Sequence, residues 1–360
     1  MSWILAFVGF ALLIILHELG HFFAAKRVGM RVEKFSLFFG KPLVKTTRGE
    51  TEYAIGWIPA GGYVKITGMN PNEELPEEVA RRSYFRAPVW KRLVVIGAGP
   101  LVNLVLAFLI LFALYWANGA FEASNKVEKV ERGSPAESVL RPGDRIIAVD
   151  GKKGDLGYLA GQIARHRCEG RQTDGCEAKT PAEITIRRGG EVMTVEVTPR
   201  WDADQRPPRP RAGFTYGGEQ IDLGPGGAAE KSVDTMWLVT SETVGVVARL
   251  FYSPEARDEV SGVVGSYEST RRAFDVDIER AVLILALISL SLAVVNLFPF
   301  LPLDGGHIFW ALAEKVRGRA IPFAVMERAS VIGFVLVALL FVIGFENDVD
   351  RLRNGEFQNR

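Results

Sequence analysis

Residues 12–25 of the 360-residue chain read LLIILHELGHFFAA, a stretch that is apolar except for His17, Glu18 and His21. The apolar run begins at Trp3, and residues 3–25 are long enough to cross a hydrocarbon layer of about 30 Å as a helix. Residues four apart share one face of a helix, so both imidazoles point the same way with Glu18 beside them. Ionisable side chains inside an apolar span are costly unless partners satisfy them, so we interpret this trio as a functional site.

Three further stretches carry no charged residue, although 24% of all residues are charged. They cover residues 94–115, 281–303 and 329–345, and each is close to the length of a membrane span. At 48% hydrophobic residues, the chain also lies near the apolar end for a soluble enzyme. The sequence therefore predicts a polytopic α-helical membrane protein with four transmembrane helices, embedded in a lipid bilayer.

Basic residues predict the orientation of these helices, because Lys and Arg near helix ends resist translocation. Residues 26–92 contain thirteen Lys and Arg residues, and Lys315, Arg317, Arg319 and Arg328 follow the third span. We expect both segments to be cytoplasmic, with the His17-Glu18-His21 trio toward that side. Both termini and residues 122–280 then face the periplasmic side. The net charge of +1 gives no support to nucleic-acid binding.

Residues 122–200 have the pattern of a small extracytoplasmic β-rich domain. Apolar and polar residues alternate in runs such as 145–149, 182–186 and 192–197, separated by Gly-rich turns. The segments Gly133-Ser134-Pro135-Ala136-Glu137 and Pro142-Gly143-Asp144, with Asp150-Gly151 as a tight turn, resemble the PDZ family. This resemblance implies a groove that receives peptide tails by strand addition.

The remaining segments have simpler patterns. Cys168 and Cys176 lie in a polar loop of this domain, and we predict that they pair as a disulfide, with two free thiols as the alternative. Residues 201–230 are rich in Pro, Arg, Asp and Gly, which predicts a linker. Within residues 231–280, apolar residues at helical spacing over 233–251 predict an amphipathic helix that lies at the membrane surface or covers the catalytic core. We expect residues 346–360 to form an extracytoplasmic tail.

Two histidines supply only two metal ligands, and the end of the third span offers a third. Residues 296–307 read NLFPFLPLDGGH, in which Asp304 is the first carboxylate after the charge-free run. The two prolines and two glycines break the helix, so its end can bend inward. The predicted topology brings Asp304 to the depth of His17 and His21. Two imidazoles and a carboxylate suit Zn²⁺, which lowers the pKa of a water molecule to about 7, and Glu18 can then act as general base.

The pairing of His-Glu-x-x-His with Asn-x-x-Pro-x-x-Pro-Leu-Asp-Gly-Gly-His resembles the site-2 protease family of intramembrane zinc metalloproteases. The layout, with residues 1–121 and 281–345 as two halves of a protease core around the PDZ insertion, resembles the bacterial regulator-of-sigma-E protease group. The resemblance implies a membrane-associated β-hairpin in residues 31–68, including Gly61 and Gly62, and Asn296 near the substrate backbone. It also implies location in the bacterial inner membrane. The implied substrates are single-span membrane proteins, such as anti-sigma factors after a first cut, or signal-peptide remnants.

Several residues keep two interpretations at this point. Gly61 and Gly62 border a substrate-binding strand edge or only form a tight turn. Asn103, in the second span, contacts substrate or bonds to a neighbouring helix. His307 supports the metal ligands, binds substrate or lies at the membrane interface; we predict the first. The group named above commonly has Ser-Gly-Pro before the third span, whereas this chain has Ser261-Gly262-Val263.

A hydrolase is not the only function class compatible with these motifs. A membrane scaffold could bind protein tails through the PDZ domain and keep a vestigial metal site, and Glu18→Gln would then change no activity. A zinc transporter would need polar residues along several spans, yet the second and fourth spans carry almost none. The sequence therefore favours an intramembrane zinc endopeptidase.

Overall fold

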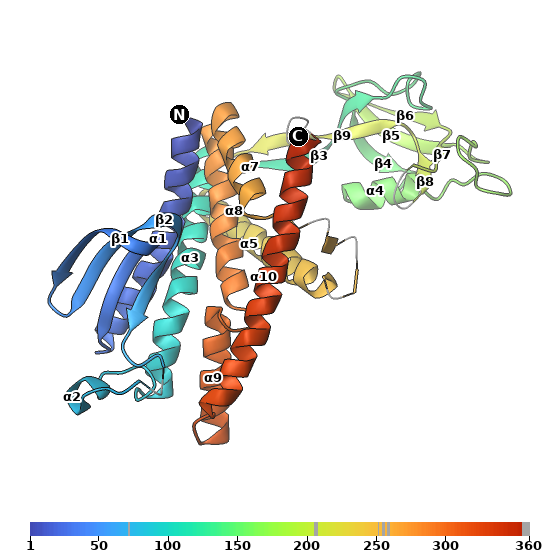
Figure 1. The fold of residues 1–360 in the computed structure, drawn as a ribbon. Coiled ribbons are helices and arrows are strands. Elements are labelled where there is room, and N and C mark those ends of the chain that lie inside the picture. Colours follow the sequence, from blue (N-terminus) through green and yellow to red (C-terminus); the bar gives the residue numbers. More distant parts are fainter. Residues whose placement is uncertain (71–72, 205–207, 251, 254–255, 258–259, 355–360) are drawn as a thin grey trace. The chain divides into compact units, whose positions relative to one another are not determined.

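The computed structural model describes residues 1–70, 73–204, 208–250, 252–253, 256–257 and 260–354, without the side chains of residues 59, 60 and 323. The chain forms two compact units (Figure 1). One combines Met1–Ala117 with Gly224–Arg360, and the other is Asn118–Leu223. We call the first the helical unit and the second the β-rich unit.

Four helices of the helical unit are long and apolar enough to cross a membrane, namely α1 (Ser2–Arg27), α3 (Val89–Asn118), α8 (Ile278–Asn296) and α10 (Phe323–Arg353). Large apolar side chains on their surfaces are exposed, for example Leu12 at 50% and Val331 at 60%. Exposed apolar surface on this scale would be unfavourable in water and is what a lipid-facing helix requires. The four predicted spans are therefore confirmed as helices that fit a membrane protein.

The ends of the third and fourth spans differ from the prediction. Helix α8 ends at Asn296 rather than at residue 303, because Pro299 cannot continue the helical hydrogen bonds. Helix α9 (Asp304–Arg317) then begins at Asp304 itself. Helix α10 extends beyond residues 329–345 on both sides, so the predicted tail is helical from residue 346 to Arg353. Residues 355–360 of that tail lie outside the described residues.

The region predicted as a hairpin forms two long antiparallel strands, β1 (Val32–Arg48) and β2 (Thr51–Ile66). Both strands bend, so the same part of β1 contacts two separate parts of β2. Leu37 of β1, for example, pairs with Gly62 on one side and with Ile55 on the other. Residues 58–66 consequently pair with β1 along one side only, and no other strand of the described chain pairs with their second side. Phe22 of α1 and Phe35 of β1 belong to the buried cluster that packs the base of this sheet against α1 and α3.

The helical unit also contains the helices α2 (Glu77–Ala80), α5 (Pro225–Arg249) and α7 (Val263–Val276). The amphipathic helix predicted over 233–251 is the C-terminal part of α5. It packs on the spans through Met236 and Val239, which contact the cluster of Ala107, Leu290 and Val294. Its Thr235 also lies 3.0 Å from the Tyr115 hydroxyl of α3.

A carboxylate of α10 caps the first turn of α7. Asp348 is fully buried and accepts hydrogen bonds from the N–H groups of Gly262 (3.1 Å) and Gly265 (2.7 Å). A carboxylate at a helix N-terminus satisfies free N–H groups and is favoured by the helix dipole. Neither bond uses the N–H of Val263, so this arrangement is compatible with either valine or proline at that position.

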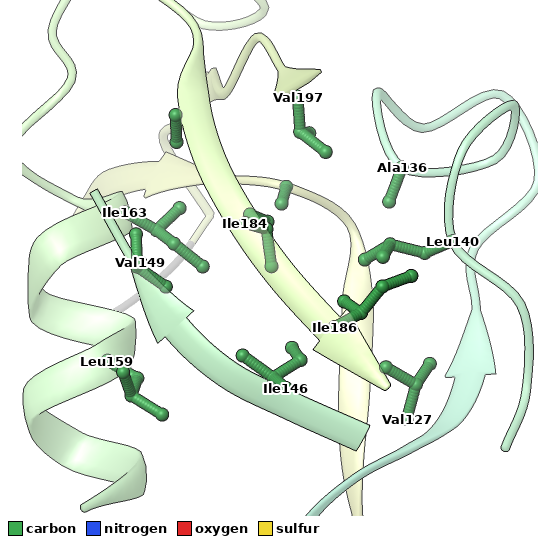
Figure 2. Packing of buried hydrophobic residues seen from close by; sticks show 12 residues of the cluster. Val127, Ala136, Leu140, Ile146, Val149, Leu159, Ile163, Ile184, Ile186 and Val197 are labelled. Carbon is green, nitrogen blue, oxygen red and sulfur yellow. The ribbon is translucent and has the colours of Figure 1, made fainter. Parts of the chain in front are cut away.

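The β-rich unit is built on a five-stranded sheet in the order β6-β5-β4-β3-β9. Its strands are β3 (Ala120–Val130), β4 (Arg145–Val149), β5 (Ala182–Arg188), β6 (Glu191–Val197) and β9 (Phe214–Ile221), with helix α4 (Leu156–Ile163). Figure 2 shows Ile146, Ile184 and Ile186 pointing into a core that Leu159 of α4 also joins. The three predicted strand runs are confirmed, and Asp150 and Gly151 both have the positive φ of a tight turn.

The predicted linker over 201–230 is wrong for most of its length. Strands β7 (Arg200–Asp202) and β8 (Arg209–Arg211) pair with each other, β9 pairs with β3, and α5 begins at Pro225. Composition suggested a linker, but alternating Phe214 and Tyr216 pack against the core and complete the sheet. Residues 205–207 lie outside the described part of the chain.

The loop between α4 and β5 is fixed by covalent and polar links. Cys168 and Cys176 form a disulfide, with their Cα atoms 6.0 Å apart. Next to it, His166 lies 2.8 Å from an Asp150 carboxylate oxygen and 3.0 Å from the Thr180 hydroxyl. His166 is therefore not an ordinary surface residue, because it ties the loop to the turn after β4.

Candidate metal centre

Three potential ligand atoms from two helices meet inside the helical unit. The Nε2 atoms of His17 and His21 are 3.2 Å apart, and Asp304 Oδ2 lies 3.2 Å from the first and 3.3 Å from the second. Both histidines are buried, each 7% exposed. The three residues form a group that could hold a metal ion.

The geometry and the donor set fit zinc. Bonds of about 2.0–2.1 Å in a tetrahedral site separate neighbouring ligand atoms by about 3.4 Å, close to the observed separations. Asp304 Oδ2 is buried and forms no hydrogen bond with any described residue. A buried carboxylate oxygen without a hydrogen bond is unfavourable unless another group compensates it. A cation shared with the two imidazoles supplies that compensation.

Local structure explains why Asp304 reaches the histidines. His17 and His21 lie one turn apart on α1, whereas Asp304 opens α9 after the bent segment that follows α8. A side chain on Gly306 would collide with the backbone of this segment, since its Cβ would lie 2.5 Å from Leu301 N. The glycines after Asp304 thus allow the first turn of α9 to pack tightly, which differs from the predicted role of breaking the helix.

Helix α3 lies directly behind the two histidines. A Cβ on Gly99 would lie 2.9 Å from His17 Nε2 and closer still to His21 Nε2, so only glycine allows this approach. By contrast, nothing lies within 4 Å of a Cβ on Gly97. The backbone carbonyl of Val95 accepts a hydrogen bond from His21 Nδ1 at 2.8 Å. No residue type could have revealed that partner in the sequence, because it is a main-chain atom.

Asn103 is the corresponding partner of His17. Its side chain is fully buried, and Nδ2 lies 3.3 Å from His17 Nδ1. Its main-chain carbonyl accepts a hydrogen bond from Ser289 of α8 at 3.0 Å. Of the two interpretations from the sequence, this arrangement favours interhelical bonding over contact with substrate.

Glu18 and the β-sheet come together beside the histidines. A Cβ on Gly62 would lie 3.3 Å from Glu18 Cγ and 3.1 Å from the Ser36 carbonyl oxygen. Gly62, in the segment 58–66 that pairs with β1 along one side only, therefore lies adjacent to the Glu18 side chain. Gly61 has a φ of +86°, which glycine adopts without strain.

Two other predicted site residues, His307 and Asn296, form no hydrogen bond or ion pair with the three ligand atoms in the described part of the chain. His307 packs edge to face on Tyr84, with ring centroids 6.3 Å apart. Among the described residues, no hydrogen bond or ion pair joins His307 to the ligand atoms, so its predicted support of the metal ligands finds no contact here. Asn296 ends α8 and is half-buried. Its substrate role stays a prediction.

An ion pair that the sequence analysis missed links α3 to α9. Arg92 is 3% exposed and donates two hydrogen bonds to the Glu314 carboxylate, at 2.9 and 2.6 Å. Two parallel bonds between a guanidinium and a carboxylate fix orientation as well as distance. The pair therefore holds the helix that carries Asp304 against α3.

Comparisons with known proteins extend over nearly the whole chain. The model of the family described as Peptidase family M50 matches residues 5–340. A protein of Clostridium perfringens named "Putative zinc metalloprotease" is 30% identical over 96% of this chain and 98% of its own length. Proteins of the same description from Nostoc sp. and Campylobacter jejuni are 31% and 29% identical, and each match covers 94% of this chain. The match covers 93% of the Nostoc protein and 91% of the Campylobacter protein.

Proposed function

The chain belongs to peptidase family M50, whose members are membrane-embedded zinc metalloproteases, and from this premise we propose that it cuts other membrane proteins within or beside the bilayer. The observation that carries the proposal is the cluster of two buried imidazoles and one carboxylate oxygen, all within 3.3 Å of one another. Membership of a protease family also argues against the scaffold and transporter alternatives.

We assign zinc to His17, His21 and Asp304. When bound, a zinc ion lowers the pKa of water to about 7 and polarises a carbonyl group. Glu18, one residue from His17 on the same helix, is the general base that removes a proton from the attacking water. It then returns the proton to the departing amine, as a carboxylate of this kind does in general acid–base catalysis.

The sheet beside Glu18 suggests how the substrate is held. A peptide bond inside a helix is hydrogen-bonded internally, so a helical substrate must become extended before its carbonyl is accessible. The unpaired side of residues 58–66 offers main-chain hydrogen bonds to an extended segment. With no side chain at Gly62, such a segment passes close to Glu18. Asn296 is our candidate for a further contact with its backbone.

The physiological context is part of the proposal. The basic residues in 26–92 support a cytoplasmic position for the sheet and for the catalytic motif, with the termini and the β-rich unit on the periplasmic side of a bacterial inner membrane. We infer that the β-rich unit acts as a PDZ domain that reads or filters peptide tails. The expected substrates are single-span proteins such as anti-sigma factors already cut once, or signal-peptide remnants, as in the regulator-of-sigma-E protease group.

The test compares the intact chain with Glu18→Gln in reconstituted vesicles that contain a single-span reporter protein. We expect cleavage to fall by about 10²–10⁴-fold, because the general base is lost, while bound zinc per chain is unchanged. Membrane proteomes of cells carrying either form should differ in single-span proteins that accumulate only with Glu18→Gln. Equal cleavage by the two forms would contradict the proposed role of Glu18.

A further inference from the structure

The two histidines of the metal centre are held by partners of different kinds. The partner of His21 Nδ1 is the Val95 carbonyl oxygen at 2.8 Å, which can only accept a hydrogen bond. Nδ1 of His21 must therefore carry the hydrogen, and the lone pair of Nε2 faces the ligand cluster. The backbone of α3 thus fixes His21 in the form that can bind a metal.

The partner of His17 is the side-chain amide of Asn103, which has both a donor and an acceptor end. With Nδ2 toward the ring, the amide donates to Nδ1, and a neutral His17 carries its hydrogen on Nε2. The hydrogen on Nε2 then occupies the position that a metal needs. A half-turn of the amide brings Oδ1 to Nδ1 instead, and the lone pair of Nε2 becomes free.

The surroundings of Asn103 support an exchange between these two orientations. Oδ1 of Asn103 is buried and has no hydrogen-bond partner among the described residues. The main chain at the same residue is fixed by the hydroxyl of Ser289, which donates to the Asn103 carbonyl oxygen at 3.0 Å. The helix therefore holds the Asn103 amide beside His17. No other described partner of Oδ1 opposes a rotation of the amide that brings Oδ1 to His17 Nδ1.

We propose that Asn103 is a positioning residue whose Oδ1 accepts a hydrogen bond from His17 Nδ1 when metal is bound, and so selects the ligating form of His17. The proposal rests on the zinc site proposed above. It implies two states of the site, in which the amide donates to His17 without metal and accepts from it with metal. Outer partners of metal-bound histidines typically change metal affinity by 10–100-fold when they are removed.

The experiment measures zinc affinity of the full-length chain in detergent by competition with a chelator, together with the visible spectrum of the Co²⁺-substituted protein. Asn103→Leu removes both polar ends of the amide and keeps the branched shape of the side chain, whereas Asn103→Asp keeps an acceptor. We expect Asn103→Leu to weaken zinc binding by about 10–100-fold and to alter the Co²⁺ spectrum. Asn103→Asp should stay close to the original affinity. Gly97→Ala, on the same helix but in open space, is the control and should leave zinc affinity unchanged.

Zinc affinity of Asn103→Leu equal to that of the unaltered chain would overturn the inference, as would an Asn103→Asp form as weak as Asn103→Leu. If Asn103→Leu does not fold, Asn103→Ala carries the same expectation without added volume. An unaltered chain that binds no zinc, or a His17→Ala form that binds it equally well, would overturn the metal site itself and this inference with it. Failure of the proposed metal site and failure of the role proposed for Asn103 therefore give different results.

Discussion

Two carboxylates, one in each unit, differ in whether their oxygens are satisfied. Asp144 of the β-rich unit is 2% exposed, and its oxygens accept hydrogen bonds from Arg188 (2.7 and 2.6 Å) and from the Arg141 N–H (2.7 Å). Asp304 of the helical unit has a buried Oδ2 that meets two imidazoles but forms no hydrogen bond with any described residue. A buried carboxylate with hydrogen bonds to both oxygens stabilises a fold. A buried carboxylate oxygen that lacks a hydrogen bond indicates a ligand site.

The largest expected effect comes from replacing each of these carboxylates by alanine. Asp304→Ala removes a ligand, so we expect loss of protease activity and a fall in zinc affinity beyond the 10–100-fold typical of outer partners. Asp144→Ala should leave bound zinc unchanged and destabilise the β-rich unit by about 2–3 kcal/mol, less than for a fully buried pair, because Arg188 keeps contact with water. Zinc analysis and thermal unfolding of both variants measure these effects. Loss of zinc in Asp144→Ala would contradict the distinction between Asp144 as a structural carboxylate and Asp304 as a ligand.

A second pair of variants tests how closely α3 approaches the metal centre. Gly99→Ala places a methyl group against both Nε2 atoms, so we expect zinc affinity and activity to fall at least about 10-fold, as for other disturbances around a metal site. Gly97→Ala meets open space and should behave like the unaltered chain. Chelator competition measures both, and equal effects would mean that the methyl group acts through helix packing instead.

Gly62→Val tests the strand edge separately from the metal. The added side chain would meet Glu18 and the Ser36 carbonyl, so we expect cleavage to slow by about 100-fold through misplacement of the reacting groups. Zinc content should be intact. Rates with the vesicle reporter and metal analysis on the same preparation provide the measurement. Parallel losses of zinc and activity would count against a substrate role for this edge.

The Asp144 pair should also make the stability of the β-rich unit depend on pH. Burial raises the pKa of Asp144, but the hydrogen bonds from Arg188 and the Arg141 N–H lower it more, so the pKa lies below its ordinary value of 3.8. The resulting stabilisation is fully present above that ordinary value and is lost as the pH falls through the lowered pKa. Thermal unfolding between neutral pH and about pH 2 should show this loss. An Asp144→Asn form with the same slope would exclude Asp144 as its source.

The smallest effect concerns the loop of the β-rich unit. With Cys168 and Cys176 paired, alkylation of the unfolded protein without reductant should add no label, and reduction should expose two thiols. Intact-mass measurement distinguishes the two results. Labelling of both thiols without reductant, in protein taken from the periplasmic side, would mean that the two cysteines are unpaired in the cell.

The sequence by itself determined the four spans, the three strand runs of the β-rich unit and the three residues that the structure brings together as a candidate metal centre. Charge-free length identifies a span whatever it packs against, and polar residues in such a span are too costly to lack a role. The same reasoning failed at the helix ends. Hydropathy identifies the apolar part of a span, but the end of α8 or α10 is set by its last main-chain hydrogen bond.

Only the tertiary structure decided which groups surround that centre. The partners of the histidines are a main-chain carbonyl at Val95 and an amide at Asn103, and their roles depend on how α3 approaches α1. The predicted linker became strands because β9 pairs with β3, a contact between residues far apart in the chain. Local sequence reports what a segment can form, but long-range pairing and close packing determine which neighbours satisfy its polar groups.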